Sequence, residues 1–284
     1  MYSKIMNTTN DIAHFQSDIG RIMYFTQDNK NYSEFCVGDW KTFVLRNVSG
    51  LDDDGLVTES NIPLKITPRG AELNSINQWI DSYFETKHLR LVRVHSMGDG
   101  TLIPHRDFLE FDEHANRWLR LHIPIKTNVA CLHSEEKDVF HMRVGEIWHL
   151  DAVHLHSATN FSNERRLNLC LDFNIGDSPA ESVFKKSVVS TKLPKPKMIE
   201  RPALDEPFMT GLMGLSRIIS DYNYRDIVGL LSKVHFYRKA DLSQFFDWLL
   251  MISKHSGSAA VFDKSETFCR FLRAERIMHQ RFTL

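Results

Sequence analysis

Several short stretches in the middle of the chain alternate apolar and polar residues. They are 89–96 (LRLVRVHS), 117–125 (RWLRLHIPI), 145–151 (GEIWHLD) and 166–175 (RLNLCLDFNI). Alternation with a period of two predicts strands, because successive side chains of a strand point to opposite faces. Turn-rich pieces separate them at 97–100, 112–116 and 133–138. Many short strands with regular turns predict a sandwich or a jelly-roll barrel, and a barrel of this type encloses a cavity.

Apolar residues recur at helical spacing on both sides of this region. Residues 70–86 place Leu73, Ile76, Ile80, Tyr83 and Phe84 on one helical face, after a strand-like stretch at 40–50. Further helical patterns cover 212–239, 242–257 and about 260–280, and Gly257 is suited to end the second of these.

A stretch rich in proline and lysine, STKLPKPKMIERPA, lies between the strand-rich and the helical parts. The sequence therefore predicts three parts, which are a jelly-roll domain with N-terminal strands and a helix over 1–178, a linker over 179–205 and a helical domain over 206–284. The expected fold class is α+β, with a cupin-like double-stranded β-helix core and a C-terminal α-helical domain.

Composition narrows the class of protein. The chain has 284 residues, a net charge of −1, 42% hydrophobic and 25% charged residues, which is typical of a globular protein. This balance argues against a nucleic-acid binder, and no window of 18 apolar residues predicts a membrane span. The N-terminus lacks a secretory h-region. Four cysteines, widely spaced, predict free thiols in a reducing cytosol, hence a cytoplasmic protein.

The segment IPHRD contains candidate metal ligands. His105 and Asp107 are two residues apart, so both point to one side of a strand. The segment LDAVHLHSATNF contains His154 and His156, and one of them can supply a second imidazole. Two histidines and a carboxylate form the facial triad of non-haem Fe(II) oxygenases, although zinc enzymes use the same donors.

Arg166 opens an apolar strand ten residues after His156. If 2-oxoglutarate chelates the metal through its 2-oxo acid end, its far carboxylate needs an anchor. A guanidinium binds a carboxylate bidentately and stays charged. The alternative is a surface ion pair between Arg166 and Glu164.

The sequence resembles the bacterial free-proline cis-3- and cis-4-hydroxylases, a branch of the aspartyl/asparaginyl β-hydroxylase-like Fe(II)/2-oxoglutarate dioxygenases. The resemblance covers most of the chain. The segments that carry it are DWKTFVLRNVSG, IPHRDFLE, LHSEEKDVFHMRVGEIWHLDAVHLHSATNFS, RRLNLCLDF and NYRDIVGLLSKVHF.

The resemblance implies a role for each matching residue. It makes His105, Asp107 and His156 the iron ligands, with His154 left in the loop. It implies that Arg166 and His133 hold 2-oxoglutarate. It assigns the substrate to Arg120, His122 and Arg93, and it implies no catalytic residue beyond the metal site. The expected cofactors are Fe(II), 2-oxoglutarate as co-substrate and O₂, with ascorbate as a stimulant.

The resemblance implies hydroxylation of a free L-amino acid, foremost L-proline (cis-3 or cis-4) or a ring homologue such as L-pipecolate. A linear amino acid such as L-lysine, a peptide or protein β-hydroxylase, and a binding module that has lost its chemistry stay open as alternatives. The expected partner is a small-molecule amino acid, with no nucleic acid and no membrane. A homodimer is open.

Overall fold

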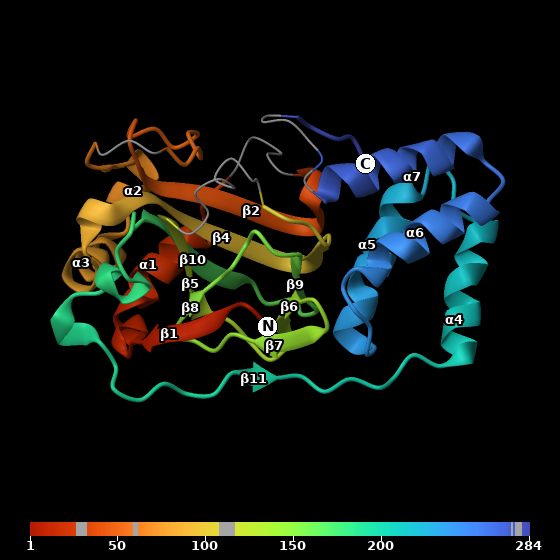
Figure 1. Ribbon diagram of the computed structural model, residues 1–284. Helices are drawn as coiled ribbons and strands as arrows, with labels where there is room; N and C mark the ends of the chain where they lie inside the picture. Colours follow the sequence, from red (N-terminus) through yellow and green to blue (C-terminus); the bar gives the residue numbers. More distant parts are fainter. Residues whose placement is uncertain (27–32, 59–61, 108–116, 274, 276–279) are drawn as a thin grey trace.

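The computed structural model describes residues 1–26, 33–58, 62–107, 117–273, 275 and 280–284. Its strands are β1 (Lys4–Thr8), β2 (Cys36–Asn47), β3 (Lys65–Ile66), β4 (Leu89–Leu102), β5 (Trp118–Lys126), β6 (Cys131–Glu135), β7 (Asp138–His141), β8 (Glu146–His149), β9 (His156–Asn160), β10 (Arg166–Asn174) and β11 (Lys197–Met198). Its α-helices are α1 (Gln16–Ile22), α2 (Pro68–Ala71), α3 (Asn74–Tyr83), α4 (Glu206–Met213), α5 (Tyr224–Tyr237), α6 (Gln244–His255) and α7 (Ala259–Leu272). Figure 1 shows the curled sheet with helices at both ends.

The strands form one curled antiparallel sheet of the jelly-roll type, in which β4 pairs with three other strands. The order along the sheet is β1-β8-β5-β10-β4-β9-β6-β7-β11, and every pairing between the strands is antiparallel. The first part of β4 pairs with β10 as far as Met97, and its last part pairs with β9 at Gly100 and Thr101. The predicted fold class, a jelly-roll core with C-terminal helices, is confirmed.

The turn predicted at 97–100 is wrong, because β4 continues through it. Its glycines serve a close approach between strands: a Cβ on Gly100 would lie 2.9 Å from the carbonyl oxygen of Val37 on β2. On β2, Gly38 has a φ of +109°, a conformation that favours glycine. The glycines therefore allow β4 to continue close beside β2 without ending. The turn predicted at 112–116 lies outside the described residues.

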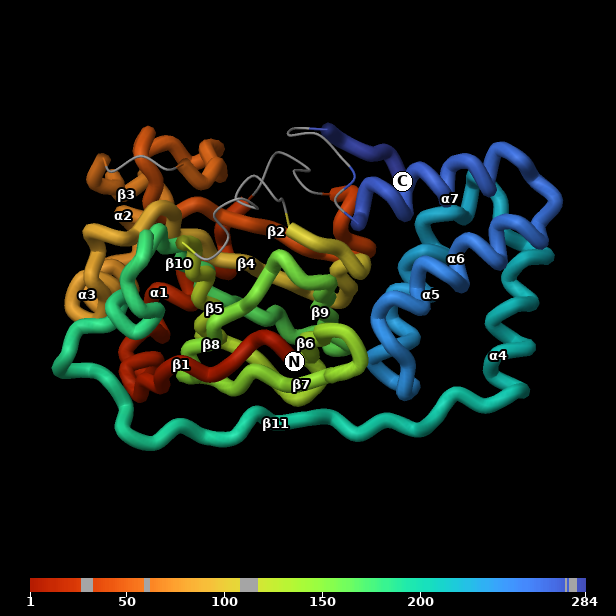
Figure 2. The backbone as a smooth tube through the Cα atoms, in the orientation of Figure 1, coloured from red at the N-terminus to blue at the C-terminus, as the bar shows by residue number. Residues whose placement is uncertain are grey.

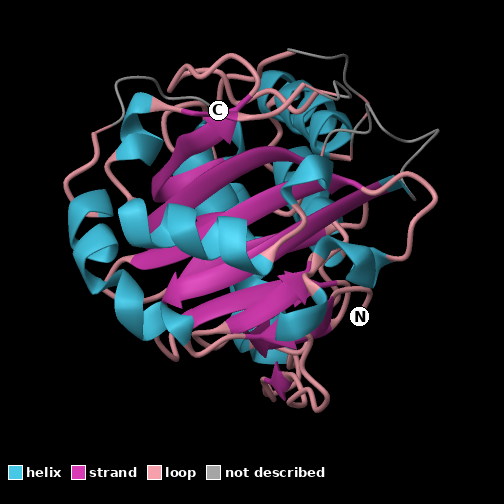
Figure 3. Ribbon diagram, turned by 90° about the vertical axis from the view of Figure 1, so that its left-hand side faces the viewer, coloured by secondary structure: helices cyan, strands magenta, loops and turns pink. Residues whose placement is uncertain are grey.

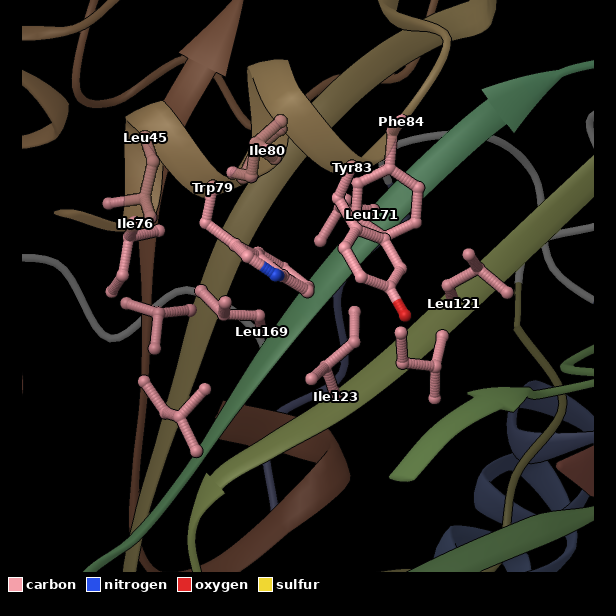
Figure 4. Packing of buried hydrophobic residues seen from close by; sticks show 14 of the residues in the cluster. Leu45, Ile76, Trp79, Ile80, Tyr83, Phe84, Leu121, Ile123, Leu169 and Leu171 are labelled. Carbon is pink, nitrogen blue, oxygen red and sulfur yellow. The ribbon is translucent and has the colours of Figure 1, made fainter. Parts of the chain in front are cut away.

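The main core lies between the sheet and helices α1–α3, which cover its outer face (Figure 3). Trp79 and Ile80 of α3 pack against Leu169 and Leu171 of β10, and Leu121 of β5 belongs to the same cluster (Figure 4). These strand residues have odd numbers, so the even-numbered residues between them face the concave side. Burial of one face leaves the other free to form a site.

The C-terminal helices form a second core of their own (Figure 1). The helix predicted over 212–239 is divided, since α4 ends at Met213, a short 3₁₀-helix follows at Gly214–Arg217, and α5 begins at Tyr224. Gly257 follows the C-cap residue of α6 and has a φ of +75°, a left-handed conformation that fits its predicted role in ending the helix.

The segment predicted as a linker follows the lower edge of the sheet in an extended path to α4 (Figure 2). The Asn7 side chain donates to the carbonyl of Val188 at 3.0 Å and accepts from the backbone N–H of Ser190 at 3.0 Å. Further on, β11 pairs with β7. Within the described part of the chain, no helix has the length and apolar character that crossing a bilayer requires.

Candidate active site

The concave face of the sheet carries charged and imidazole side chains. On β10, the even-numbered residues Arg166, Asn168, Cys170 and Asp172 are buried although three of them are polar or charged. Register places Cys170 beside both Arg93 of β4 and His122 of β5. Polar groups without water are costly unless they are paired or bind a ligand, so this face is the candidate site.

Three predicted metal ligands meet at one end of this face. The donor atoms of His105, Asp107 and His156 all lie within 4.8 Å of one another. The backbone brings them together, since the N–H of His105 donates to the carbonyl of His156 at 3.1 Å and the reverse bond is 3.0 Å. His105 and His156, which are 51 positions apart in the sequence, thus form an isolated antiparallel β-bridge.

Hydrogen bonds orient both imidazoles toward the carboxylate. The Nδ1 of His105 lies 2.6 Å from the carbonyl of Ile103, and the Nδ1 of His156 lies 2.9 Å from that of His154. A carbonyl only accepts, so each Nδ1 carries the proton and each Nε2 keeps its lone pair. These Nε2 atoms lie 3.5 and 3.7 Å from Oδ1 of Asp107.

Burial holds the pKa of His156 well below its usual value, which keeps the ring neutral as a metal ligand must be. Two imidazoles whose Nδ1 atoms are held by backbone carbonyls, together with one carboxylate, suit a divalent transition metal. His154 lies apart from this trio. Its ring stacks on Tyr2, and its Nε2 lies 3.5 Å from Asp151.

A second set of donors lies deeper on the concave face, formed by His95, His122 and Cys170. Burial, and then the charges of Arg93, Arg120 and Arg166, hold the pKa of His95 well below its usual value. The same positive charges disfavour a metal cation here. Arg120 also lies at the trio, but there the carboxylate of Asp107 balances its charge, so the electrostatic environment favours the trio at His105 over this set.

Arg166 is buried without a carboxylate partner among the described residues. Its side chain is 6% exposed, and its contact is a long one, from Nη2 to Sδ of Met142 at 3.8 Å. The alternative ion pair with Glu164 is not formed; the Glu164 carbonyl instead accepts from Asn160. A buried guanidinium needs an anion, so this position suits a carboxylate ligand.

His133 lies between Arg166 and the trio. Its ring centre is 6.2 Å from that of His156, and neither of its buried ring nitrogens has a partner. Burial, and then the charge of Arg166, keep its pKa well below the usual value. An imidazole with two unused polar atoms is a candidate ligand contact beside Arg166.

The predicted substrate arginines meet at the other side of the trio. The Nε of Arg120 donates to Oδ1 of Asp172 at 2.6 Å, and its Nη1 donates to Oδ2 of Asp107. The Nη2 of Arg93 donates to Oδ2 of Asp172 at 2.6 Å. His122 lies further in, where its Nδ1 accepts from Asn168 at 2.6 Å.

Asp172 is the site residue that sequence reasoning missed. It is 4% exposed and lies between the two arginines. An acidic residue at an even position of the otherwise apolar RLNLCLDF was the available signal, because Arg166 has the same parity and faces the same side.

Family models and curated relatives of this chain point to the same protein family. The family model for aspartyl/asparaginyl β-hydroxylase matches residues 4–175, and the model for the C-terminal part of L-proline 3-hydroxylase matches 179–280. An L-proline cis-4-hydroxylase of Rhizobium meliloti (strain 1021) is 37% identical over 86% of this chain and 86% of its own. L-proline cis-3-hydroxylase 2 of a Streptomyces species is 33% identical over 96% of this chain and 95% of its own.

Solved structures are less similar. A 2OG-Fe(II) oxygenase family oxidoreductase from Burkholderia pseudomallei has a TM-score of 0.33 at 13% identity, over 49% of this chain and 69% of its own. The non-heme monooxygenase ThoJ in its nickel complex has a TM-score of 0.36 at 11% identity, over 74% and 90%.

The two family models together span nearly the whole chain, and the curated relatives are matched over most of their length. The resemblance seen in the sequence is thereby confirmed. The chain belongs to the family of the L-proline cis-3- and cis-4-hydroxylases, within the aspartyl/asparaginyl β-hydroxylases.

Proposed function

We propose that this protein is an Fe(II)/2-oxoglutarate-dependent hydroxylase of free L-proline, or of a ring homologue such as L-pipecolate. Two kinds of observation support the proposal. Relatives named as L-proline cis-4- and cis-3-hydroxylases match most of the chain. The concave face holds a metal-ligand trio and, on either side of it, separate cationic groups.

In this proposal His105, Asp107 and His156 hold iron(II), because the carboxylate and the two Nε2 atoms, which keep their lone pairs, lie close together. Iron(II), with 2-oxoglutarate and O₂, supplies the oxidising power for C–H hydroxylation when bound, which side chains lack. The protein's own residues position the ligands and exclude water. Phe35 packs against His105 with ring centres 5.0 Å apart, which shields that side of the trio.

The observation that carries the proposal is the buried Arg166, which has no carboxylate partner among the described residues. Its guanidinium suits the far carboxylate of 2-oxoglutarate, and His133 lies between that group and the trio. A dicarboxylic co-substrate satisfies both the metal and Arg166, whereas a neutral ligand would leave the charge unpaired.

Arg93 and Arg120 lie on the opposite side from Arg166 and suit the carboxylate of the amino-acid substrate. Proline is favoured over L-lysine and over a peptide because the matched relatives are named as L-proline hydroxylases. The regiochemistry, at C3 or C4, depends on which C–H the pocket presents to the metal.

The test measures succinate release under Fe(II), 2-oxoglutarate, O₂ and ascorbate, the last to keep iron reduced. L-proline, L-pipecolate, L-lysine and a proline-containing peptide are compared, and the product is identified by mass spectrometry and NMR. We expect hydroxyproline or hydroxypipecolate, with little turnover of lysine or peptide. If no free amino acid raises succinate release above the rate without substrate, the proposal is wrong.

A further inference from the structure

Asp172 binds both Arg93 and Arg120, with one carboxylate oxygen for each at 2.6 Å. We propose that Asp172 is a positioning residue that aims the two guanidinium groups at the carboxylate of a free amino acid. This inference rests on the proposed function and extends it to a residue that touches no ligand itself.

The register of the sheet explains why one carboxylate reaches both arginines. β10 lies between β4 and β5, and Asp172 stands directly opposite Arg120. Arg93 stands opposite Cys170, one inward position along β10, and its guanidinium also lies 3.6 Å from Sγ of Cys170. The middle strand therefore holds the shared acceptor, and each outer strand contributes one donor.

Asp172 is ionised in this cluster. Burial alone would raise the pKa of Asp172, but the charges and hydrogen bonds of Arg120 and Arg93 lower it below its usual value. An ionised carboxylate with two oxygens can hold both guanidinium groups at once, one on each oxygen.

Asp172 also links the substrate position to the metal. Arg120 uses Nε for Asp172 and Nη1 for Asp107, and its Nη2 has no hydrogen bond to a described residue. Because two of the three guanidinium nitrogens of Arg120 are held in this way, the direction in which Nη2 points is fixed relative to the metal-ligand trio. A fixed direction matters because a displacement of about 1 Å between the C–H and the metal lowers the rate strongly.

The first test replaces Asp172 with asparagine, which keeps the shape but removes the charge. We expect the KM for L-proline to rise at least tenfold in Asp172→Asn. The preference for L-proline over L-prolinamide should fall by a similar factor, because the amide lacks the charge that the arginines recognise. The affinity for 2-oxoglutarate, followed anaerobically by the absorbance of the Fe(II) complex, should stay within twofold.

The matched control is Asp39→Asn. Asp39 forms an ion pair with Arg165, with its side chain 44% exposed, and lies outside the site. This variant should keep the wild-type KM for L-proline. A purely structural role for Asp172 predicts instead that both affinities weaken together or that neither changes, and either result would overturn the inference.

A second measurement does not depend on the folding of a variant. We expect a crystal structure of the wild-type protein with Mn(II), 2-oxoglutarate and L-proline to show the proline carboxylate on both guanidinium groups while each still contacts Asp172. Release of either arginine from Asp172, or a carboxylate bound elsewhere, overturns the inference. A wild-type protein that converts no free amino acid overturns the proposed function and the inference together, whereas normal wild-type turnover with an unchanged Asp172→Asn overturns the inference alone.

Discussion

At the scale of single residues, the site depends on how buried polar atoms are oriented and paired. Backbone carbonyl groups fix the proton of His105 and of His156 on Nδ1, so each Nε2 keeps its lone pair. Arg166 is buried with no carboxylate partner among the described residues, and neither ring nitrogen of His133 has a hydrogen-bond partner among them. A folded protein tolerates such groups at a cost, which a ligand removes.

The two histidines of the HLH segment give a matched test of the metal site. His156→Ala should abolish stoichiometric iron binding, because it removes one of three ligands. His154→Ala should retain iron, since His154 stacks on Tyr2 and lies outside the trio. The measurement is the iron content after reconstitution and desalting. Equal iron in both variants would contradict the assignment.

Arg166 and its neighbour Arg165 form a second pair for testing. Arg166→Ala should raise the KM for 2-oxoglutarate by about 10- to 100-fold, the equivalent of about 1.5–3 kcal/mol for a hydrogen-bonded charge. Arg165→Ala should leave this KM unchanged, since Arg165 binds Asp39 and Ser96 instead. Steady-state kinetics with 2-oxoglutarate as the varied substrate decide the matter, and a normal KM in Arg166→Ala would refute the anchor role.

At the scale of elements, β4 is the strand that organises the site. Its first part pairs with β10 and carries Arg93, and its end pairs with β9 and leads directly into the metal-ligand segment. Its glycines were misread as a turn because glycine is the usual residue of turns. Only the neighbouring strand β2, at a distance in sequence, shows that they serve close approach.

Helix α5 makes a comparable close approach, which a pair of glycine variants can test. A Cβ on Gly229 would lie 2.7 Å from Cγ1 of Val37 on β2, so Gly229→Ala should destabilise the protein by about 1–3 kcal/mol despite its better helix propensity. In α4, Gly211 has nothing within 4 Å, so Gly211→Ala should stabilise by up to about 1 kcal/mol. Urea denaturation measures both, and equal shifts would contradict the packing argument.

At the scale of the whole molecule, the C-terminal helices contact the barrel next to the metal site. The carbonyl of Leu272, at the end of α7, accepts from the backbone N–H of Arg106 at 3.1 Å. Phe35 packs between His105 and Phe271. The helices therefore support the segment that carries two metal ligands. The three-part division of the chain, the cytoplasmic location and a homodimer stay predictions.

Buried histidines predict how stability depends on pH. Burial holds the pKa of His122, His133 and His235 well below 6.5, so these rings are neutral in the folded protein. The unfolded chain takes up protons as the pH falls below about 6.5, while the folded chain does not. Stability is therefore full above pH 6.5 and falls below it, by about 1.4 kcal/mol per pH unit for each such histidine.

The measurement is the urea midpoint of the metal-free protein at pH 7.5 and 5.5. His235 lies on α5, where its Nε2 is 2.8 Å from Oγ of Ser134 on β6. His235→Gln keeps a polar group there but does not titrate, so it should weaken the pH dependence by about one histidine's share. A midpoint that is independent of pH, or equal pH dependence in the variant, would show that these rings do not carry the effect.

The sequence by itself determined the elements and the types of chemistry. Alternation predicted the strands around β5 and β10, because burying one face of a sheet imposes a period of two. The spacing of His105 and Asp107 and the position of Arg166 pointed to a metal and an anion, because few side chains suit either ligand.

Only the tertiary structure decided which of these groups meet. Asp172 gains its place between Arg93 and Arg120 from the register of three strands, which no local pattern specifies. The choice of His156 over His154 in space, and the continuation of β4 through its glycines, likewise depend on partners that lie far away in the chain. Local preferences act over a few residues, whereas strand pairing and burial select among the arrangements that those preferences allow.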